Sequence, residues 1–386
     1  MKRIALYQTI VAGKQKRGPH FFYPLFFNDY TKQEQSNYEI FYFIKTNDVQ
    51  QIQNDFKSLG FTLDNVVFFE SKHHRFKSKH EGWELTKALK KHRIDLFHLL
   101  TYANPQEELP LLKKVVKKNF KTAFTITYNG IPAAFQNNAD ERFLKDKAKY
   151  GELFENIPFN GLLSWYNDWP DFVKSNSMFS HGPEVYVIKS RYCDTRRFKP
   201  GEKQNYLTFA SALTPYKHPL MFLEAVLLLS RWTPKIKSWK IIICGQGSEE
   251  DKIRKRITDE NAQSWIELRP PTDDIAPLIN ESKVYVSCQE IDNFPSLAMN
   301  EAMAAGNAII ARPVGRTNLF VKNGMNGFIA NEDNIEGIAK AIQSFIERDQ
   351  DEQRSMMNES VRLTKEVHTS DAFIKQIDEF WTQIIP

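Results

Sequence analysis

Short apolar runs alternate with patterns of helical period along the first 200 residues. This alternation is typical of a doubly wound parallel sheet, in which a helix follows most strands. Ligands of such sheets bind at the carboxyl ends of the strands, so binding residues are expected in the loops that follow them. The predicted strands are 4–8, 39–44, 66–69, 95–100, 123–127, 161–164 and 185–188, and the predicted helices are 49–59, 83–92 and 105–119.

The same alternation restarts after a polar stretch at 200–205, which has the composition of a hinge. The pattern therefore predicts an α/β protein with two doubly wound, Rossmann-like domains, 1–198 and 199–368, followed by an amphipathic segment, 369–386. The strands predicted in the second half are 206–210, 240–244, 265–268, 284–287 and 308–311, and the helices are 248–261 and 370–385.

The stretch from 292 to 311 predicts a loop, a helix, a turn and a strand. Pro295 and Ser296 mark a helix start. The first backbone amides of a helix have no carbonyl partner, so proline, which has no N–H, is tolerated there, and a serine oxygen caps the other amides. Gly306 stands where a helix ends through a left-handed residue. The first amides of this helix form an anion site, and Glu301 lies about a turn further in. We interpret this pair as a nucleotide site, with diphosphate on the amides and sugar hydroxyls on the carboxylate.

A second candidate is Lys217. Thr214 and Pro215 predict a cap and first helical position, which would put Lys217 in a first turn. The helix dipole disfavours a cation there by roughly 0.3–1 kcal/mol, so a lysine at this position suggests an anion beside it. The alternative is a solvated lysine without a function.

The run Asp292-Asn-Phe-Pro followed by Glu301-Ala-Met-Ala-Ala-Gly resembles the motif of retaining glycosyltransferases with the GT-B fold, family 4 type. That motif has two glutamates separated by seven residues. The resemblance implies two Rossmann-like domains facing a cleft, with Glu301 on the donor ribose. The donor-sugar contact falls on Asn293, or on Asp292 if the Phe-Pro pair is aligned. The loop and helix start that the resemblance places on the donor are Phe294, Pro295, Ser296 and Leu297.

Residues 211–219 resemble the family's Gly-Arg-Leu-x-x-x-Lys, whose arginine and lysine clamp the donor diphosphate. Lys217 matches the lysine, whereas Ala212 stands in place of the arginine. A basic side chain from elsewhere would have to replace it, and the candidates are Arg17, Arg312 and Arg316. The resemblance also places Gly245 and the loop at Arg269 near the nucleotide, and Gly18 near the acceptor and donor phosphates, although Gly18 is equally well explained as a plain turn.

The resemblance covers residues 206–345 in detail and residues 1–200 only in architecture. It implies that the helix at 369–386 packs back on the first domain. Tyr128 or Asn129 occupies the place where the family has a histidine, and His98 is expected to be structural. With Ala212, Asn293 and Leu319 also departing from the motif, two alternatives stay open: a catalytically degenerate scaffold or regulatory subunit, and a GT-B epimerase.

The expected activity is a hexosyltransferase-like, metal-independent step of glycan biosynthesis. A nucleoside diphosphate sugar is the co-substrate, no cofactor is expected, and the acceptor is a glycan, a lipid-linked molecule or a protein. Of the 386 residues 41% are hydrophobic and no apolar run approaches a membrane span, while the N-terminus enters a strand. Three widely spaced cysteines fit a reducing cytoplasm.

Charge differs between the two halves. Residues 1–200 carry 31 Lys and Arg against 21 Asp and Glu, whereas residues 201–386 carry 21 against 26. Each basic cluster of the first half, taken alone, is best explained as a solvated helix face. Together the clusters suggest that the first half approaches an anionic membrane surface or a phosphorylated acceptor. A peripheral position at the inner face of the membrane is therefore an expectation, and nucleic acid is not expected as a partner because no nucleic-acid-binding motif accompanies the charge.

Overall fold

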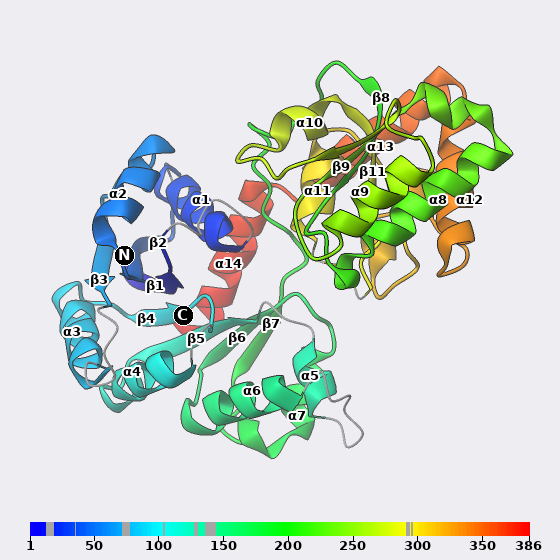
Figure 1. Ribbon diagram of the computed structural model, residues 1–386. Helices are drawn as coiled ribbons and strands as arrows, with labels where there is room; N and C mark the ends of the chain where they lie inside the picture. Colours follow the sequence, from blue (N-terminus) through cyan, green and yellow to red (C-terminus); the bar gives the residue numbers. More distant parts are fainter. Residues whose placement is uncertain are drawn as a thin grey trace. The chain divides into compact units, whose positions relative to one another are not determined.

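The structure is a computed structural model of the chain, and it describes all residues except 13–18, 35, 72–77, 103–104, 127–129, 136–143, 291–293 and 295. The chain folds into two compact units. One consists of Met1–Lys189 with Asp371–Pro386, and the other of Ser190–Ser370. Figure 1 shows the elements of each unit, which are described separately below.

The first unit is built on a seven-stranded sheet in the order β3-β2-β1-β4-β5-β6-β7, in which every pairing is parallel. The order reverses between β1 and β4, which is the switch point of a doubly wound sheet. The strands are β1 (Lys2–Ile10), β2 (Tyr38–Thr46), β3 (Val66–Glu70), β4 (Leu96–Leu99), β5 (Lys121–Ile126), β6 (Gly161–Ser164) and β7 (Glu184–Val187).

Helices cover both faces of this sheet. One face packs against α3, α4, α6 and α7 through a large cluster of aromatic and aliphatic side chains. The other face packs against α1, α2 and α14, where Phe373 of α14 contacts Phe22 and Phe26 of α1. The helices are α1 (Pro19–Thr31), α2 (Val49–Ser58), α3 (Ser78–Lys91), α4 (Pro105–Lys117), α5 (Gly130–Ala134), α6 (Leu144–Asn156), α7 (Trp169–Ser175), the 3-10 turn η2 (Ser177–Phe179) and α14 (Ser370–Ile384).

The second unit is built on a six-stranded sheet in the order β10-β9-β8-β11-β12-β13, again parallel throughout. Its switch point lies between β8 and β11. The strands are β8 (Gln204–Ala210), β9 (Lys240–Cys244), β10 (Ile266–Arg269), β11 (Ser282–Ser287), β12 (Ala308–Ala311) and β13 (Gly327–Ile329).

The central strands of this sheet are apolar on both faces because helices cover both. Helices α8, α9 and α12 pack on one face, and α10, α11 and α13 on the other. The helices are α8 (Pro219–Trp232), α9 (Glu250–Asp259), α10 (Ala276–Glu281), α11 (Leu297–Ala304), α12 (Ile335–Ile346) and α13 (Gln350–Val367), with the 3-10 turns η3 (Pro215–Lys217), η4 (Pro234–Ser238) and η5 (Thr317–Leu319).

The α/β class and the two doubly wound sheets predicted from the apolar pattern are confirmed. The aromatic run at 21–27 lies in α1, with Phe22, Tyr23, Phe26 and Phe27 buried. Cys193, Cys244 and Cys288 are buried thiols without a disulfide. In the described part of the chain, no helix combines the length and the apolar character needed to cross a membrane.

Candidate functional site

The candidate site of the second unit lies at the carboxyl edge of its sheet. At the switch point the loops after β8 and β11 leave the sheet in opposite directions, and this divergence opens the crevice in which doubly wound folds bind ligands. The β8 loop carries Lys217 and the β11 loop begins with Cys288, Gln289 and Glu290. The two loops are joined because the Glu290 amide donates a hydrogen bond of 3.0 Å to the Tyr216 carbonyl.

Lys217 lies at this junction. Its Nζ donates a hydrogen bond of 2.8 Å to Gln289 Oε1, across the switch point. No described carboxylate forms an ion pair with it, and burial lowers its pKa below the ordinary value of a lysine. A partly buried ammonium that is bonded only to a neutral amide retains a positive charge to offer an anion.

The predicted helix start at Thr214 and Pro215 is present only as a short 3-10 turn, and the α-helix starts later than predicted. Pro215–Lys217 form the 3-10 turn η3, Thr214 makes no capping bond, and α8 begins only at Pro219. The helix is interrupted because His218, between the two, has a left-handed backbone with φ 50° and ψ 49°. Lys217 therefore does not lie in the first turn of an α-helix, and the helix dipole gives no reason to expect an anion beside it. The hydrogen bond to Gln289 is the observation that marks Lys217 instead.

The predicted helix after the β11 loop is α11. Ser296 is its N-cap, and the Ser296 hydroxyl accepts from the Met299 amide at 3.2 Å. The Ser296 carbonyl accepts from Asn300, so the amide of Leu297 precedes the first backbone bond of the helix. Gly306 ends the helix with φ 73°, as the pattern predicts. Asp292, Asn293 and Pro295 lie outside the described residues, and the roles expected for them stay predictions.

Phe294 and Arg316 meet beside the start of α11. Phe294 is buried and its ring contacts Phe320. The Arg316 guanidinium lies 5.2 Å from the centre of the Phe294 ring, and Nη2 is 3.4 Å from the Phe294 carbonyl. This arrangement places one cation of the β12 loop near the amides of α11.

Glu301 lies mid-helix in α11. The residue as a whole is partly exposed, but its carboxyl group is buried, and this burial raises its pKa to about 8 although Arg197 and Arg191 oppose the change. No group of the described residues donates a hydrogen bond to this carboxylate. A buried carboxyl group without a donor costs stability, and such groups occur where a ligand supplies the hydrogen bond.

Gly245 and Arg269 have structural contacts in this site. A Cβ on Gly245 would lie 2.0 Å from the Ser211 carbonyl oxygen, and one on Gly247 would lie 2.2 Å from the Leu213 carbonyl oxygen, so both glycines allow the loops after β8 and β9 to touch. The Arg269 side chain forms a bidentate pair with Glu267, at 2.8 and 3.0 Å. Their donor-binding role stays a prediction, and the loop packing explains the glycines without a ligand.

No other arginine simply replaces the motif arginine, whose position is occupied by Ala212. Arg312 is held by Asp333 at 2.5 and 2.8 Å, and its Nη1 donates to the Cys288 carbonyl, so it cannot turn towards a diphosphate without breaking these bonds. Ala212 itself is exposed. Arg17 lies outside the described residues. Arg316 is the one of the three that the structure places near the start of α11.

In the first unit, His98 is a structural residue. Its Nδ1 accepts a hydrogen bond of 3.0 Å from Trp381, and its Nε2 bonds the Thr125 hydroxyl at 2.7 Å. Burial lowers its pKa to about 3, so it stays neutral. Gly18, Tyr128 and Asn129 lie outside the described residues.

Residues 194–364, somewhat under half of the chain, match the model of a protein family described as glycosyl transferases group 1. We refer to this matched region as the group 1 domain. Across the whole chain, the structure of Anabaena Alr3699/HepE in complex with UDP is similar with a TM-score of 0.71 and 13% identity, covering 99% of this chain and 100% of that one. The GT-B glycosyltransferase fold inferred from the motifs is confirmed.

Two curated relatives match parts of the chain. The UDP-N-acetylglucosamine–peptide N-acetylglucosaminyltransferase GtfA subunit of Streptococcus gordonii is 25% identical over 53% of this chain and 40% of its own length. The poly(ribitol-phosphate) α-N-acetylglucosaminyltransferase of Staphylococcus aureus is 27% identical over 36% of this chain and 28% of its own length. The matches thus span less than half of either relative.

The sequence analysis did not single out Gln289, Glu290 and His218, although the group 1 domain places all three beside Lys217. Gln289 and Glu290 could have been found from their position, because they follow a strand of the switch point. His218 offers no such signal, since its left-handed backbone is visible only in the structure.

Proposed function

We propose that the chain is a retaining, metal-independent hexosyltransferase of the family 4 type, which transfers a sugar from a nucleoside diphosphate sugar to a glycan, a lipid-linked molecule or a protein. The observation that supports this most directly is the position of Lys217 at the switch point of the second unit, with its ammonium bonded to Gln289 and to no described carboxylate. A cation there neutralises the charge that develops on a departing diphosphate, a task that needs no metal ion.

Glu301 supports the same proposal from the other end of a nucleotide. A carboxylate that lacks a hydrogen-bond donor among the described residues can accept both hydroxyls of a ribose. The start of α11, capped by Ser296, offers amides to phosphate oxygens. We propose UDP as the nucleotide and an N-acetylhexosamine as the sugar, because relatives are named for N-acetylglucosamine transfer and a neighbouring structure holds UDP.

The test is turnover by the purified full chain with a panel of UDP-, GDP- and ADP-sugars, with and without candidate acceptors. Release of nucleoside diphosphate, with retained configuration at the anomeric carbon by NMR and unchanged rates in a chelator, is the expected result. Product with inverted configuration would contradict the retaining mechanism. A rate that depends on added metal would contradict the metal-independent one.

The alternative is a catalytically degenerate GT-B scaffold or regulatory subunit. It is favoured by Ala212, which is exposed where the motif has an arginine, and by the commitment of Arg312 to Asp333. Under this alternative the same panel shows nucleotide binding but neither hydrolysis nor transfer. The assay therefore separates the two functions.

We also propose that the protein acts in the cytoplasm and that the outer face of α3 and α4 contacts an anionic membrane. Eight exposed cations lie on these adjacent helices or within four residues after them, and none forms an ion pair within the described part of the chain. Trp83, 55% exposed, lies among them, with Lys87 Nζ 5.1 Å from its ring. The cations are Lys87, Lys90, Lys91, Arg93, Lys113, Lys117, Lys118 and Lys121.

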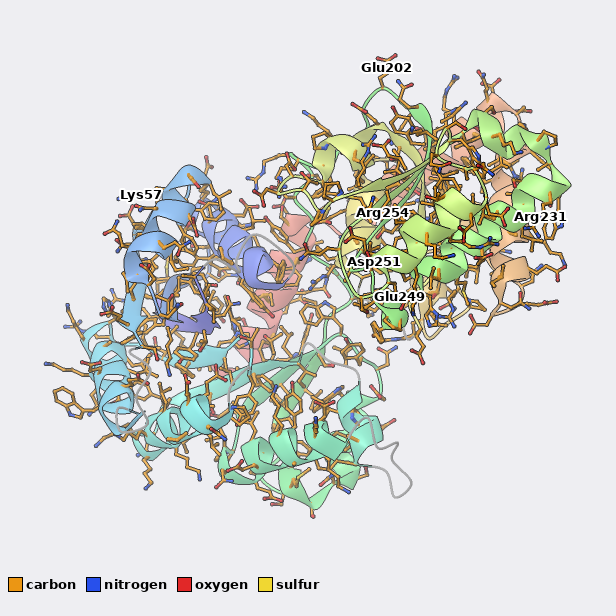
Figure 2. All side chains as sticks on the ribbon, viewed as in Figure 1. Lys57, Glu202, Arg231, Glu249, Asp251 and Arg254 are labelled. Atoms are coloured by element: carbon orange, nitrogen blue, oxygen red, sulfur yellow. The ribbon has the colours of Figure 1, made fainter. Side chains whose placement is uncertain are left out.

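Helix α9 of the second unit shows what an ordinary charged helix looks like in this protein. Its basic residues are neutralised by neighbours: Lys252 by Glu249, Arg254 by Glu250 and Lys255 by Asp259. Figure 2 labels Asp251 and Arg254 on this helix and Glu249 directly before it. Because the eight cations named above form no ion pair within the described part of the chain, their charge is available to anionic headgroups, and an exposed tryptophan suits the interface of a bilayer.

A further inference from the structure

His218 has a backbone conformation that its side chain does not favour. With φ 50° and ψ 49° it lies in the left-handed region, directly before Pro219. Glycine adopts this conformation without strain, and asparagine tolerates it, whereas a histidine adopts it at a conformational cost. Strained residues of this kind cluster at functional sites, so the side chain is the feature to explain.

The imidazole belongs to the loop that follows β8 at the carboxyl edge of the sheet, next in sequence to Lys217. Its Nε2 is buried, has no hydrogen-bond partner in the described part of the chain, and lies 3.9 Å from Glu290 Oε2. The ring is about one-third exposed, and no described residue bonds Nδ1, so Nδ1 is accessible to a ligand. Glu290 on one nitrogen and an open position on the other is an arrangement in which a carboxylate can hold an imidazolium that binds an anion.

Charged groups of both signs act on the ring. Burial and Arg312 keep the pKa of His218 below its ordinary value, whereas three carboxylates oppose this. A ring that is neutral in the free protein becomes charged when a further anion arrives, because a nearby negative charge favours the protonated form. The groups that face the ring are Glu290 after β11, Arg312 after β12, Asp333 after β13 and Glu249 at the start of α9.

We propose that His218 is a second diphosphate-binding residue beside Lys217, which takes up a proton when the nucleotide sugar binds and so supplies the positive charge that Ala212 does not. The inference rests on the proposed function. It also gives a physical reason for a histidine at a left-handed position that glycine fits better, because glycine could not carry this charge.

The test is isothermal titration calorimetry with UDP-N-acetylglucosamine, in buffers of different ionisation enthalpy, on wild type, His218→Gly and His218→Asn. This donor suits the purpose because its diphosphate is esterified at both ends and has no group that titrates near neutral pH. Both variants accept the left-handed backbone, so the turn that positions Lys217 is kept.

Wild type should take up more protons on binding than either variant. The ratio of the wild-type affinity to the affinity of either variant should be about tenfold larger at about pH 6 than at about pH 8. This is the effect expected of one charge-assisted contact. A purely structural histidine would leave the difference in proton uptake at zero. Equal proton uptake by wild type and His218→Gly would overturn the proposal while leaving the transferase function standing. Absence of binding by wild type to every nucleotide sugar of the panel would overturn both.

Discussion

Lys217 is the residue on which the proposed chemistry depends most. Its partly buried ammonium is bonded to the neutral Gln289, so removing it takes away a positive charge that no described neighbour replaces. We expect Lys217→Ala to lower turnover by about two to three powers of ten, with a smaller effect on donor affinity, because leaving-group charge is greatest in the transition state.

The measurement is single-turnover transfer or donor hydrolysis at saturating donor. Lys237→Ala is the matched control, since Lys237 is an exposed lysine of the same unit in η4. Equal rates for wild type and Lys217→Ala would remove this residue from the mechanism and favour the non-catalytic scaffold.

Replacing Glu301 by glutamine should raise the stability of the fold and weaken nucleotide binding. Its buried carboxyl keeps its proton to about pH 8, whereas in the unfolded chain it loses it near the ordinary value of 4.5. Between these values unfolding releases a proton, so this group lowers the free energy of unfolding as pH rises. We expect Glu301→Gln to raise the melting temperature near pH 8 and to leave it unchanged near pH 5.

Nucleotide binding by Glu301→Gln should weaken by roughly 1–3 kcal/mol above about pH 8, where an amide replaces a charged acceptor of ribose hydroxyls. Thermal melts and UDP titrations of the same samples measure both effects. A variant that loses stability at both pH values and keeps its UDP affinity would show that Glu301 is structural.

The sequence identified these two residues through different signals. Glu301 could be predicted because cap, helix and strand around it follow from local patterns, and the structure has them. Lys217 was found by its motif, while the helix argument for it failed at His218. The contact with Gln289 could not be predicted, because it joins loops 72 residues apart whose spacing depends on sheet order.

At the level of elements, prediction succeeded where burial fixes the pattern. Central strands such as β9 and β12 are apolar throughout and were found close to their observed limits. The edge strand β13 was missed because its three residues carry no periodic signal. Helix α1 was not among the predicted helices, because its aromatic residues are apolar all round and therefore show no amphipathic period.

The α3–α4 face gives the prediction for this scale. Vesicles that contain anionic phosphatidylglycerol should bind the protein more strongly than vesicles of phosphatidylcholine alone, and the difference should disappear at high salt, because exposed charges are screened. The double reversal Lys113→Glu and Lys117→Glu should reduce this binding by about tenfold or more, since each basic residue near the surface contributes about 1 kcal/mol.

The control is the equal charge change at Lys32 and Lys57, exposed lysines of the same unit outside α3 and α4; Figure 2 labels Lys57 on α2. If the control lowers binding as much as the reversal on α4, net charge and not this face is responsible. Binding to soluble polyphosphate but not to vesicles would instead indicate a phosphorylated acceptor.

At the scale of the whole molecule, the chain leaves the first unit at Lys189 and returns to it at Asp371. Helix α14 fills one face of the first sheet after the second unit is complete. Asp378 accepts hydrogen bonds from Tyr30 and Asn37, at 2.6 and 3.0 Å. A Cβ on Gly161 of β6 would lie 2.2 Å from Ile384, so strand and helix are in close contact there.

The first unit should therefore depend on the last residues of the chain, whereas the second should not. Trp381 is fully buried and donates to His98, so Trp381→Ala leaves a large cavity and an unpaired imidazole nitrogen, at a cost of about 3–5 kcal/mol. Trp232→Ala, which removes a tryptophan 40% exposed in the second unit, is the matched control.

Calorimetry together with limited proteolysis and mass spectrometry reports the loss of stability for each unit. Trp381→Ala should lower the unfolding temperature of the first unit alone and leave the UDP-induced stabilisation of the second unchanged. Equal loss in both units would show that they unfold as one cooperative body.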